Sequence, residues 1–233
     1  MDRTAAFLGV ERSLSGRRWQ AAAGDSRLAA TLSQRLGLPE IVGRVLAARG
    51  IGLDEAEGFL EPRLRDLLPD PAHLLDMDKA AARIAAAVMA GEPIGVFGDY
   101  DVDGATSSAL LNVFLTAAGA RVLVHIPDRL TEGYGPNLPA LLALGAQGVR
   151  VVVTVDCGTT AFAPLAGAAE AGLDVIVVDH HEAEPDLPRV LALVNPKRLD
   201  ESSPHGHLAA VGVAFLLAVA VNRDLKAAGW YVG

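Results

Sequence analysis

Three aspartates stand two residues apart in the segment GDYDVDGATSS, directly behind a short apolar run. They are Asp99, Asp101 and Asp103. Carboxylates this close repel one another, and proteins relieve such repulsion by raising pKa values or by binding a cation. A bound divalent cation is the interpretation that best accounts for so much negative charge, and it would bring Lewis-acid chemistry to the segment.

Polar residues also end two later apolar runs. Asp156 ends the run VRVVVTVD, and Asp179, His180 and His181 follow the run LDVIVV. Each run is rich in β-branched residues and predicts a buried strand. The carboxyl ends of parallel strands share one edge of the sheet, where such folds bind ligands. We therefore expect the three polar clusters to meet.

The combined residue types narrow the chemistry. Oxygen ligands alone suit Mg²⁺ or Ca²⁺, whereas added imidazole favours Mn²⁺ and similar transition metals. Two ions about 3.5–4 Å apart could share an aspartate, clamp phosphoryl oxygens and generate hydroxide near neutral pH. The pattern indicates metal-assisted hydrolysis of a phosphoester.

Other interpretations of the aspartate triplet fit less well. A calcium loop needs an acid at its twelfth position, but counting from Asp99 this is Leu110, and the segment follows a strand instead of a helix. The D-x-D-x-[TV] signature of phosphatases with an aspartyl nucleophile would require Thr or Val where Ala105 stands. That signature does not call for the histidine pair either, so it remains the weaker alternative.

Single residues of the clusters also have structural explanations. Asp103 and Asp156 could each cap a following helix. Together these explanations leave His180 and His181 without a role. Cys157 is interpreted as a small packed residue, because no sequence feature indicates a lowered pKa of its thiol.

The segment IPDRLTEGYGPN (126–137) is too polar and too rich in glycine for a helix, and long enough to reach over the sheet edge. Arg129 could pair with a phosphate and Tyr134 could stack on a base. A solvated turn is the competing explanation for each. His205 and His207 are spaced so that they could bind a metal, but we interpret them as loop histidines.

Periodicity gives the expected architecture. Apolar residues recur at helical spacing from about 26 to 90, and β-branched runs alternate with Ala- and Leu-rich stretches after Gly91. We predict a small helical N-terminal region (1–90) and an α/β domain (91–233). The domain is expected to contain a parallel five-stranded sheet flanked by helices.

Charge is divided unevenly along the chain. The net charge is −8, yet residues 1–50 contain eight arginines against four acids, which leaves an acidic remainder. Phosphate binding depends largely on Lys and Arg. The basic start could contact nucleic acid or form a solvated arginine-rich helix face. The acidic body could be loaded with metal when the protein works.

The sequence gives no sign of export or membrane insertion. The start of the chain lacks the apolar core of a signal peptide. The apolar run 208–221 is shorter than the roughly 18–20 residues that cross a bilayer, so we expect a buried helix. With only one cysteine the chain forms no internal disulfide, and we expect a cytoplasmic protein.

Four motifs together resemble one known family. GDYDVDGATS, PDRLTEGYG, VDCGTT and VVDHH, in this order, resemble the DHH phosphoesterase superfamily. FLEPRLRDLLPDP and GVAFLLA extend the resemblance to the N-terminal part of the RecJ exonucleases. The resemblance implies a 5′→3′ exonuclease of DNA recombination and repair that is specific for single-stranded DNA.

The resemblance also implies a ligand set for two divalent ions, Mn²⁺ or Mg²⁺. Asp101 and Asp103 would bind metal, Asp156 would lie between the two ions, and His180 would be a further ligand. These four side chains would form the catalytic centre together with His181.

The remaining residues of the centre would support ligands and substrate. The resemblance implies that Asp99 and Asp179 lie among the metal ligands or just behind them. His181 would contact the scissile phosphate or a metal. With Arg129 and Tyr134, it completes the expected substrate-binding set.

Some features of the family have no counterpart in this sequence. The segment LAAVG stands where the family often has Cys-Gly-Ala-Gly. One more metal-binding aspartate, a DHHA1-type domain and an oligonucleotide-binding fold would follow further along the chain. We therefore expect an N-terminal fragment with little or no activity alone. Single-stranded DNA is the expected partner, and the family implies a helicase and a single-strand-binding protein.

Two other functions remain open. The chain could belong to a DHH phosphodiesterase for short oligonucleotides or cyclic dinucleotides, or to a DHH pyrophosphatase. It could also be a DHH-like module that serves as a non-catalytic scaffold in replication. Such modules typically lose their metal ligands, so the acids and His180 favour catalysis.

Overall fold

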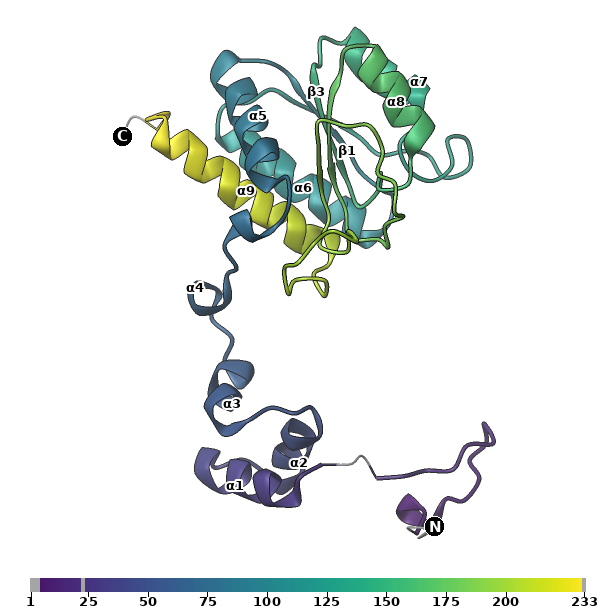
Figure 1. Cartoon of the computed structure of the whole chain (residues 1–233), viewed down its shortest axis with the longest axis vertical. Helices are drawn as coiled ribbons and strands as arrows, with labels where there is room; N and C mark the ends of the chain where they lie inside the picture. The colour runs from purple at the N-terminus through teal and green to yellow at the C-terminus, as the bar shows by residue number, and fades with distance from the viewer. Residues whose placement is uncertain (1–4, 22–23, 232–233) are drawn as a thin grey trace. The chain divides into compact units, whose positions relative to one another are not determined.

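A computed structural model of the protein describes residues 5–21 and 24–231. The chain forms two compact units, Met1–Leu68 and Pro69–Gly233. Figure 1 shows a first unit of short helices and a second unit in which helices surround a sheet.

The regular elements described in the first unit are all helices. Its elements are η1 (Phe7–Gly9), α1 (Ser26–Leu36), α2 (Glu40–Ala48), α3 (Leu53–Leu60) and α4 (Leu64–Leu67). Asp25 begins α1 by accepting hydrogen bonds from the backbone N–H groups of Arg27 and Leu28. The small core consists of Ala29, Leu32, Leu46, Ala47 and Ala56.

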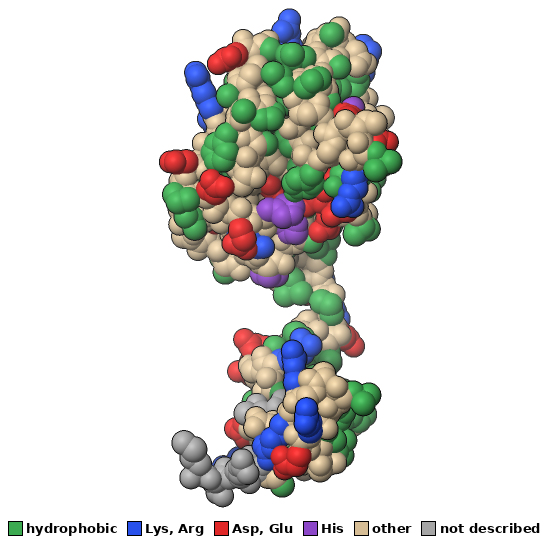
Figure 2. All heavy atoms as spheres, turned by 90° about the vertical axis from the view of Figure 1, so that its right-hand side faces the viewer, with side chains coloured by type: hydrophobic (Ala, Val, Ile, Leu, Met, Phe, Trp, Pro, Cys, Tyr) green, Lys and Arg blue, Asp and Glu red, His purple; other side chains and the backbone are tan. Residues whose placement is uncertain are grey.

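The arginines on and next to α1 and α2 are exposed. Arg27 and Arg35 on α1, Arg44 on α2 and Arg49 just after it are all exposed. Figure 2 shows Lys and Arg side chains gathered on the visible face of this unit. The exposure is compatible with both explanations of the basic N-terminal region, a solvated face or a contact to nucleic acid.

The second unit alternates helices and strands. Its elements are η2 (Pro71–His73), α5 (Met77–Ala90), β1 (Ile94–Phe97), α6 (Val102–Ala117), β2 (Val122–His125), α7 (Leu138–Ala146), β3 (Val151–Val155), α8 (Phe162–Glu170), β4 (Asp174–Val178), β5 (Ala192–Val194) and α9 (Ala210–Ala227). The strands form one sheet in the order β2-β1-β3-β4-β5. All neighbouring strands pair in parallel, which confirms the predicted fold class.

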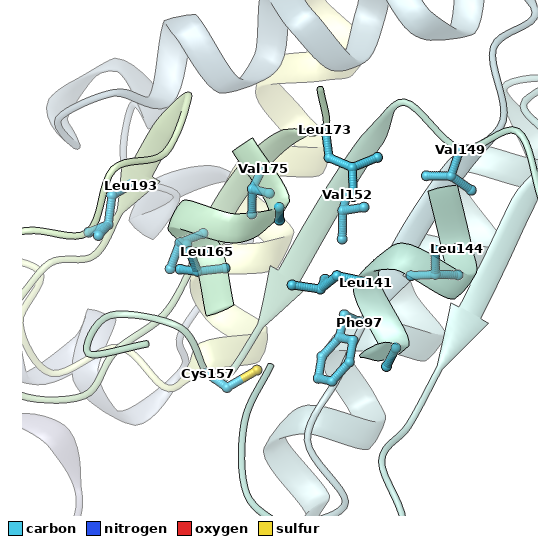
Figure 3. Close-up of a cluster of buried hydrophobic side chains, with 13 residues drawn as sticks. Phe97, Leu141, Leu144, Val149, Val152, Cys157, Leu165, Leu173, Val175 and Leu193 are labelled. Atoms are coloured by element: carbon cyan, nitrogen blue, oxygen red, sulfur yellow. The ribbon is translucent and has the colours of Figure 1, made fainter. Parts of the chain in front are cut away.

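Helices cover both faces of the sheet. Helices α5, α6 and α9 lie on one face, and α7 and α8 on the other (Figure 1). Between the sheet and α7 and α8, a core packs Phe97, Val152, Leu141 and Leu165 (Figure 3). Every residue of β3 is buried, which explains why this strand has a continuous apolar sequence instead of an alternating one.

Helix α5 packs within the second unit. It lies against α9 and β5, and the guanidinium of Arg83 pairs with Glu92 and Asp174 at 2.7 Å each. The compact units divide between Leu68 and Pro69, whereas the sequence pattern placed the boundary near residue 90. Helical periodicity shows that α5 is a helix, but it does not show which core the helix joins.

The long apolar run near the end of the chain forms the buried helix that was expected. It lies in α9, which packs against α5 and α6. No helix in the described ranges is long and apolar enough to span a bilayer.

A close approach of backbones joins β1 to α6. Asp101 caps α6 by accepting a hydrogen bond from the N–H of Gly104. A Cβ atom on Gly104 would lie 2.5 Å from the backbone N and O atoms of Asp99. Only glycine therefore lets the first turn of α6 pack against the end of β1, where the aspartate triplet lies.

We expect the substitution Gly104→Ala to destabilise the fold. The added methyl group meets backbone that has no room to yield, and overpacking of this kind costs about 1–3 kcal/mol. The free energy of unfolding in urea measures the loss. Gly206→Ala is the matched control, because its Cβ would lie 3.7 Å from the nearest atom outside the adjacent residues. Equal stability of the two variants would contradict the prediction.

Candidate metal centre

The sheet brings the three polar clusters together at its carboxyl edge. In one group, ligand atoms of Asp99, Asp101 and Asp156 all lie within 4.8 Å of one another. A second group with the same spacing consists of Asp156, His180 and His181. Asp156 belongs to both groups, so it lies where two ions could share a ligand. Figure 2 shows histidine and acidic side chains adjacent on this unit.

Asp156 is buried without a hydrogen-bond donor. Its relative exposure is 1%, and neither carboxylate oxygen accepts a hydrogen bond from the described residues. The nearest basic atom is Nε2 of His180, 3.2 Å from Oδ1. Burial, followed by the neighbouring Asp101, raises the pKa of Asp156 to about 8. An ionised carboxylate in this position requires a cation, so the site fits a divalent metal.

The backbone holds Asp156 in an uncommon conformation. Its φ is +61°, in the left-handed region that Asp tolerates better than most residues. Its N–H donates to the carbonyl of Val178 at 3.0 Å, which continues the ladder between β3 and β4 by one residue. Sheet pairing therefore places the carboxylate at the edge.

Two aspartates of the triplet, Asp99 and Asp101, lie close to Asp156. Asp101 is exposed, and the hydrogen bond from the Gly104 N–H lowers its pKa. Asp103 lies in the first turn of α6 with Oδ2 at 3.8 Å from Nε2 of His180. Asp99 is almost fully buried, and its pKa is raised by burial, although it accepts a hydrogen bond from the N–H of Tyr100.

Asp179 differs from Asp156 because protein donors already satisfy it. It accepts hydrogen bonds from the N–H of Thr159 at 3.0 Å, the N–H of His180 at 2.8 Å and Nδ1 of His181 at 2.7 Å. Burial raises the pKa of Asp179, but the bonds from His181 and Thr159 outweigh it and lower the pKa to about 2. Asp179 is thus suited to orient His181, and it raises the pKa of that imidazole.

The loop 126–137 reaches the centre with both of its predicted substrate residues. The hydroxyl of Tyr134 donates to the carbonyl of Asp156 at 3.4 Å, and its ring meets that of His181 edge-on at 6.3 Å. The guanidinium of Arg129 lies 5.1 Å from the centroid of the Tyr100 ring. Both side chains are largely exposed, so they remain accessible to a substrate.

Sequence reasoning overlooked several supporting residues. The guanidinium of Arg129 lies over the ring of Tyr100. Asn195 donates hydrogen bonds to the Thr159 hydroxyl and to the His181 carbonyl, both at 2.9 Å. Asn195 directly follows β5, so the strand-end pattern that identified the acids could have found it too. No comparable signal singled out Tyr100.

Three of the histidines outside the centre form a separate group. His205 packs with His73 of η2 at 6.2 Å between ring centroids and with His207 at 6.4 Å. None of the three belongs to a potential metal-binding group among the described residues. Cys157 is buried, and burial raises the pKa of its thiol, in keeping with a packed residue.

The raised pKa of Asp156 predicts how the stability of the metal-free chain, kept in the presence of a chelator, depends on pH. Because the folded state keeps the proton that the unfolded state has lost, the contribution of this group to stability is lost as pH rises from about 4 towards 8. Asp156→Asn cannot ionise. We expect the variant to gain stability relative to the wild type over this range, by at most about 1.4 kcal/mol per pH unit.

Urea unfolding at several pH values measures this difference. Asp224→Asn on α9 serves as the control, and its stability is expected to follow the wild type at every pH. Parallel curves for the wild type and Asp156→Asn would show that the carboxyl is already ionised and compensated in the metal-free fold.

Comparison with known proteins places the chain in a family. It also shows that the chain matches only a part of each larger relative. RecJ of Bacillus subtilis (strain 168), a single-stranded-DNA-specific exonuclease, is 40% identical over 209 residues, which cover 89% of this chain and 26% of the relative. RecJ of Escherichia coli (strain K12) is 35% identical over 195 residues, which cover 83% and 33%. The chain thus spans about a quarter to a third of these relatives.

Solved structures agree with the sequence matches. The crystal structure of RecJ from Thermus thermophilus in complex with Mn²⁺ aligns with a TM-score of 0.69 and 30% identity, over 88% of this chain and 28% of that chain. The structure of exonuclease RecJ bound to manganese aligns with a TM-score of 0.60 and 38% identity, over 68% and 39%. The sequence model of the DHH family, N-terminal domain, matches residues 93–229. This chain belongs to the DHH family.

Proposed function

We propose that this chain supplies the metal-binding half of a single-stranded-DNA-specific 5′→3′ exonuclease that depends on Mn²⁺ or Mg²⁺. The observation that carries the proposal is the buried carboxylate of Asp156, which lacks a donor among the described residues and belongs to two potential ligand groups. The matched relatives are named as single-stranded-DNA-specific exonucleases, and two of the similar solved structures contain manganese.

The donor set fits a pair of ions. Asp101, Asp103, Asp156 and His180 would hold them, with Asp99 close enough to join. Carboxylate oxygens with one or two imidazoles suit Mn²⁺ as well as Mg²⁺. When bound, the ions would stabilise negative charge on the phosphate and lower the pKa of a water molecule.

The protein itself would orient the phosphate. Asp179 engages Nδ1 of His181, which leaves Nε2 of that ring free to donate to a phosphate oxygen. The pKa of His181 is raised by this pairing, so the proton is retained more readily near neutral pH. Arg129 would pair with a second phosphate and Tyr134 would stack on a base.

Charge supports a metal-dependent encounter with DNA. The chain after residue 50 carries twice as many acids as bases, which repels phosphate in the absence of cations. Two bound divalent ions would offset the four carboxylates of Asp99, Asp101, Asp103 and Asp156 and so remove this repulsion at the centre. An enzyme limited to single strands would work with a helicase that produces them and with a single-strand-binding protein.

We expect Asp156→Ala to reduce the affinity for Mn²⁺ at least tenfold, because it removes the ligand common to both groups. Isothermal titration of the purified chain measures binding. Asp224→Asn, which lies on α9 and in neither ligand group, is expected to bind like the wild type. An unchanged affinity of Asp156→Ala for Mn²⁺ would contradict the proposed metal centre.

A chimaera tests catalysis. Replacing the aligned segment of Bacillus subtilis RecJ with this chain should give an enzyme that degrades 5′-ended single strands with Mn²⁺. Introducing Asp156→Ala should lower its rate by at least about a thousandfold while DNA binding persists, since the ions supply most of the charge stabilisation.

Two outcomes of the chimaera assay would contradict the proposal. One is a folded chimaera that binds Mn²⁺ but does not cleave DNA. The other is equal cleavage with and without the Asp156 carboxylate, which would point to a scaffold role for this chain. Preference for short oligonucleotides or cyclic dinucleotides over long single strands would favour the alternative phosphodiesterase.

A further inference from the structure

The middle of the loop 126–137 is largely exposed, although Pro127, Gly135 and Pro136 are buried. This loop must nevertheless place two substrate residues accurately. It has no helix or strand of its own, and Leu130 at its tip is 94% exposed. Arg129 and Tyr134 lie on opposite sides of this tip. A loop of this kind needs an internal anchor, because each ordered residue costs conformational entropy.

Glu132 is one of two carboxylates in the loop, and its side chain accepts hydrogen bonds from both ends of it. Its Oε1 lies 2.9 Å from Nε2 of His125 and accepts a hydrogen bond from Nδ2 of Asn137 at 3.2 Å. Its Oε2 accepts the backbone N–H of Asp128 at 2.9 Å. These hydrogen bonds lower the pKa of Glu132, the bond from Asp128 most strongly, so the side chain is a charged acceptor. Both oxygens of Glu132 are thus engaged, by His125, Asp128 and Asn137.

The donors at the two ends of the loop belong to rigid elements. His125 is the last residue of β2, and its ring packs against Phe97 in the core at 5.1 Å between centroids. Asn137 caps α7 by accepting the N–H of Ala140. Glu132 therefore ties the tip of the loop to the end of a strand and to the start of a helix.

A turn at residues 128–132 adds to the anchor. Oδ1 of Asp128 accepts the N–H groups of Leu130 and Thr131 at 2.9 and 3.0 Å, and the N–H of Glu132 donates to the Asp128 carbonyl at 2.8 Å. Arg129 lies inside this turn, so the hydrogen bonds of the turn restrain its backbone. Its guanidinium is directed over Tyr100, beside the aspartates.

We propose that Glu132 is a positioning residue that holds Arg129 and Tyr134 beside the metal centre. The assignment rests on the proposed function, because it gives these two side chains their substrate. Glu132 itself contacts neither Asp156 nor the histidines at 180 and 181 through any described hydrogen bond or ion pair. It acts through the loop. A glutamine in its place would keep only one acceptor oxygen and would satisfy only part of the donor set.

Hydrogen exchange of the purified chain tests the anchor without any ligand. We expect Glu132→Ala to speed exchange in peptides from 126–137 about tenfold or more, while peptides from β3 stay protected. Glu132→Gln should lie between Ala and the wild type. His125→Phe keeps a ring against Phe97 but lacks the donor, so it should loosen the same peptides. Glu170→Ala, an exposed glutamate at the end of α8, is the control.

Side-chain NMR tests the position of Arg129 directly. Its guanidinium lies 5.1 Å from the centroid of the Tyr100 ring, so we expect a ring-current shift that Tyr100→Leu would identify. Glu132→Ala should remove this shift and Glu170→Ala should keep it. If the loop peptides stay protected, or if the shift survives in Glu132→Ala, the positioning role is wrong.

Binding measurements separate this inference from the proposed function. In Glu132→Ala, Mn²⁺ affinity should stay within about twofold, whereas the affinity for a 5′-phosphorylated single-stranded oligonucleotide should fall about tenfold. Adding Arg129→Ala to Glu132→Ala should weaken binding little further, because both act through the same contact. Additive losses, or unchanged affinity in Glu132→Ala, would contradict the positioning role.

A wild-type chain that binds Mn²⁺ but no oligonucleotide would count against the proposed function. In that case hydrogen exchange and the Arg129 shift still decide whether Glu132 holds the loop. The two proposals therefore fail in distinguishable ways.

Discussion

The candidate site depends on one unsatisfied group, the carboxylate of Asp156. It is buried at the end of a strand that is itself covered on both faces, and its oxygens accept no hydrogen bond from the described residues. Burying an ionised carboxylate without a partner costs several kcal/mol. In the metal-free fold the cost is reduced by keeping the proton, which is why its pKa is raised to about 8. A divalent cation offers the other solution, and the neighbouring ligands are placed for it.

The residues around Asp156 differ in how far protein donors already use their oxygen and nitrogen lone pairs. Asp101 accepts a hydrogen bond from the N–H of Gly104, and Nε2 of His180 lies 3.8 Å from Asp103 and 3.2 Å from Asp156. Asp179 uses its oxygens to accept from Thr159, His180 and His181, so it fixes the orientation of an imidazole. The same chemical group thus has different roles on adjacent strands, and the difference follows from how many protein donors surround each carboxylate.

In the proposed function, substrate contacts come from a loop that joins the end of β2 to the start of α7. Its exposed tip carries a cation towards the acidic centre, and Glu132 uses both of its oxygens to join the tip to β2 and α7. A parallel sheet favours this arrangement, because its connections and its polar strand ends share one edge. Binding residues on loops of this kind are accurate only where the scaffold restrains them.

The sequence by itself determined the parallel sheet, the buried α9 and the meeting of Asp99, Asp101, Asp156 and the histidines 180 and 181. These follow from local periodicity and from the rule that parallel strands end at one edge. Only the tertiary structure decided that α5 joins the second unit, that Asp156 lacks a described donor while Asp179 is satisfied, and that Tyr100, Glu132 and Asn195 support the site. Burial and hydrogen-bond partners depend on residues distant in sequence, and local patterns do not encode them.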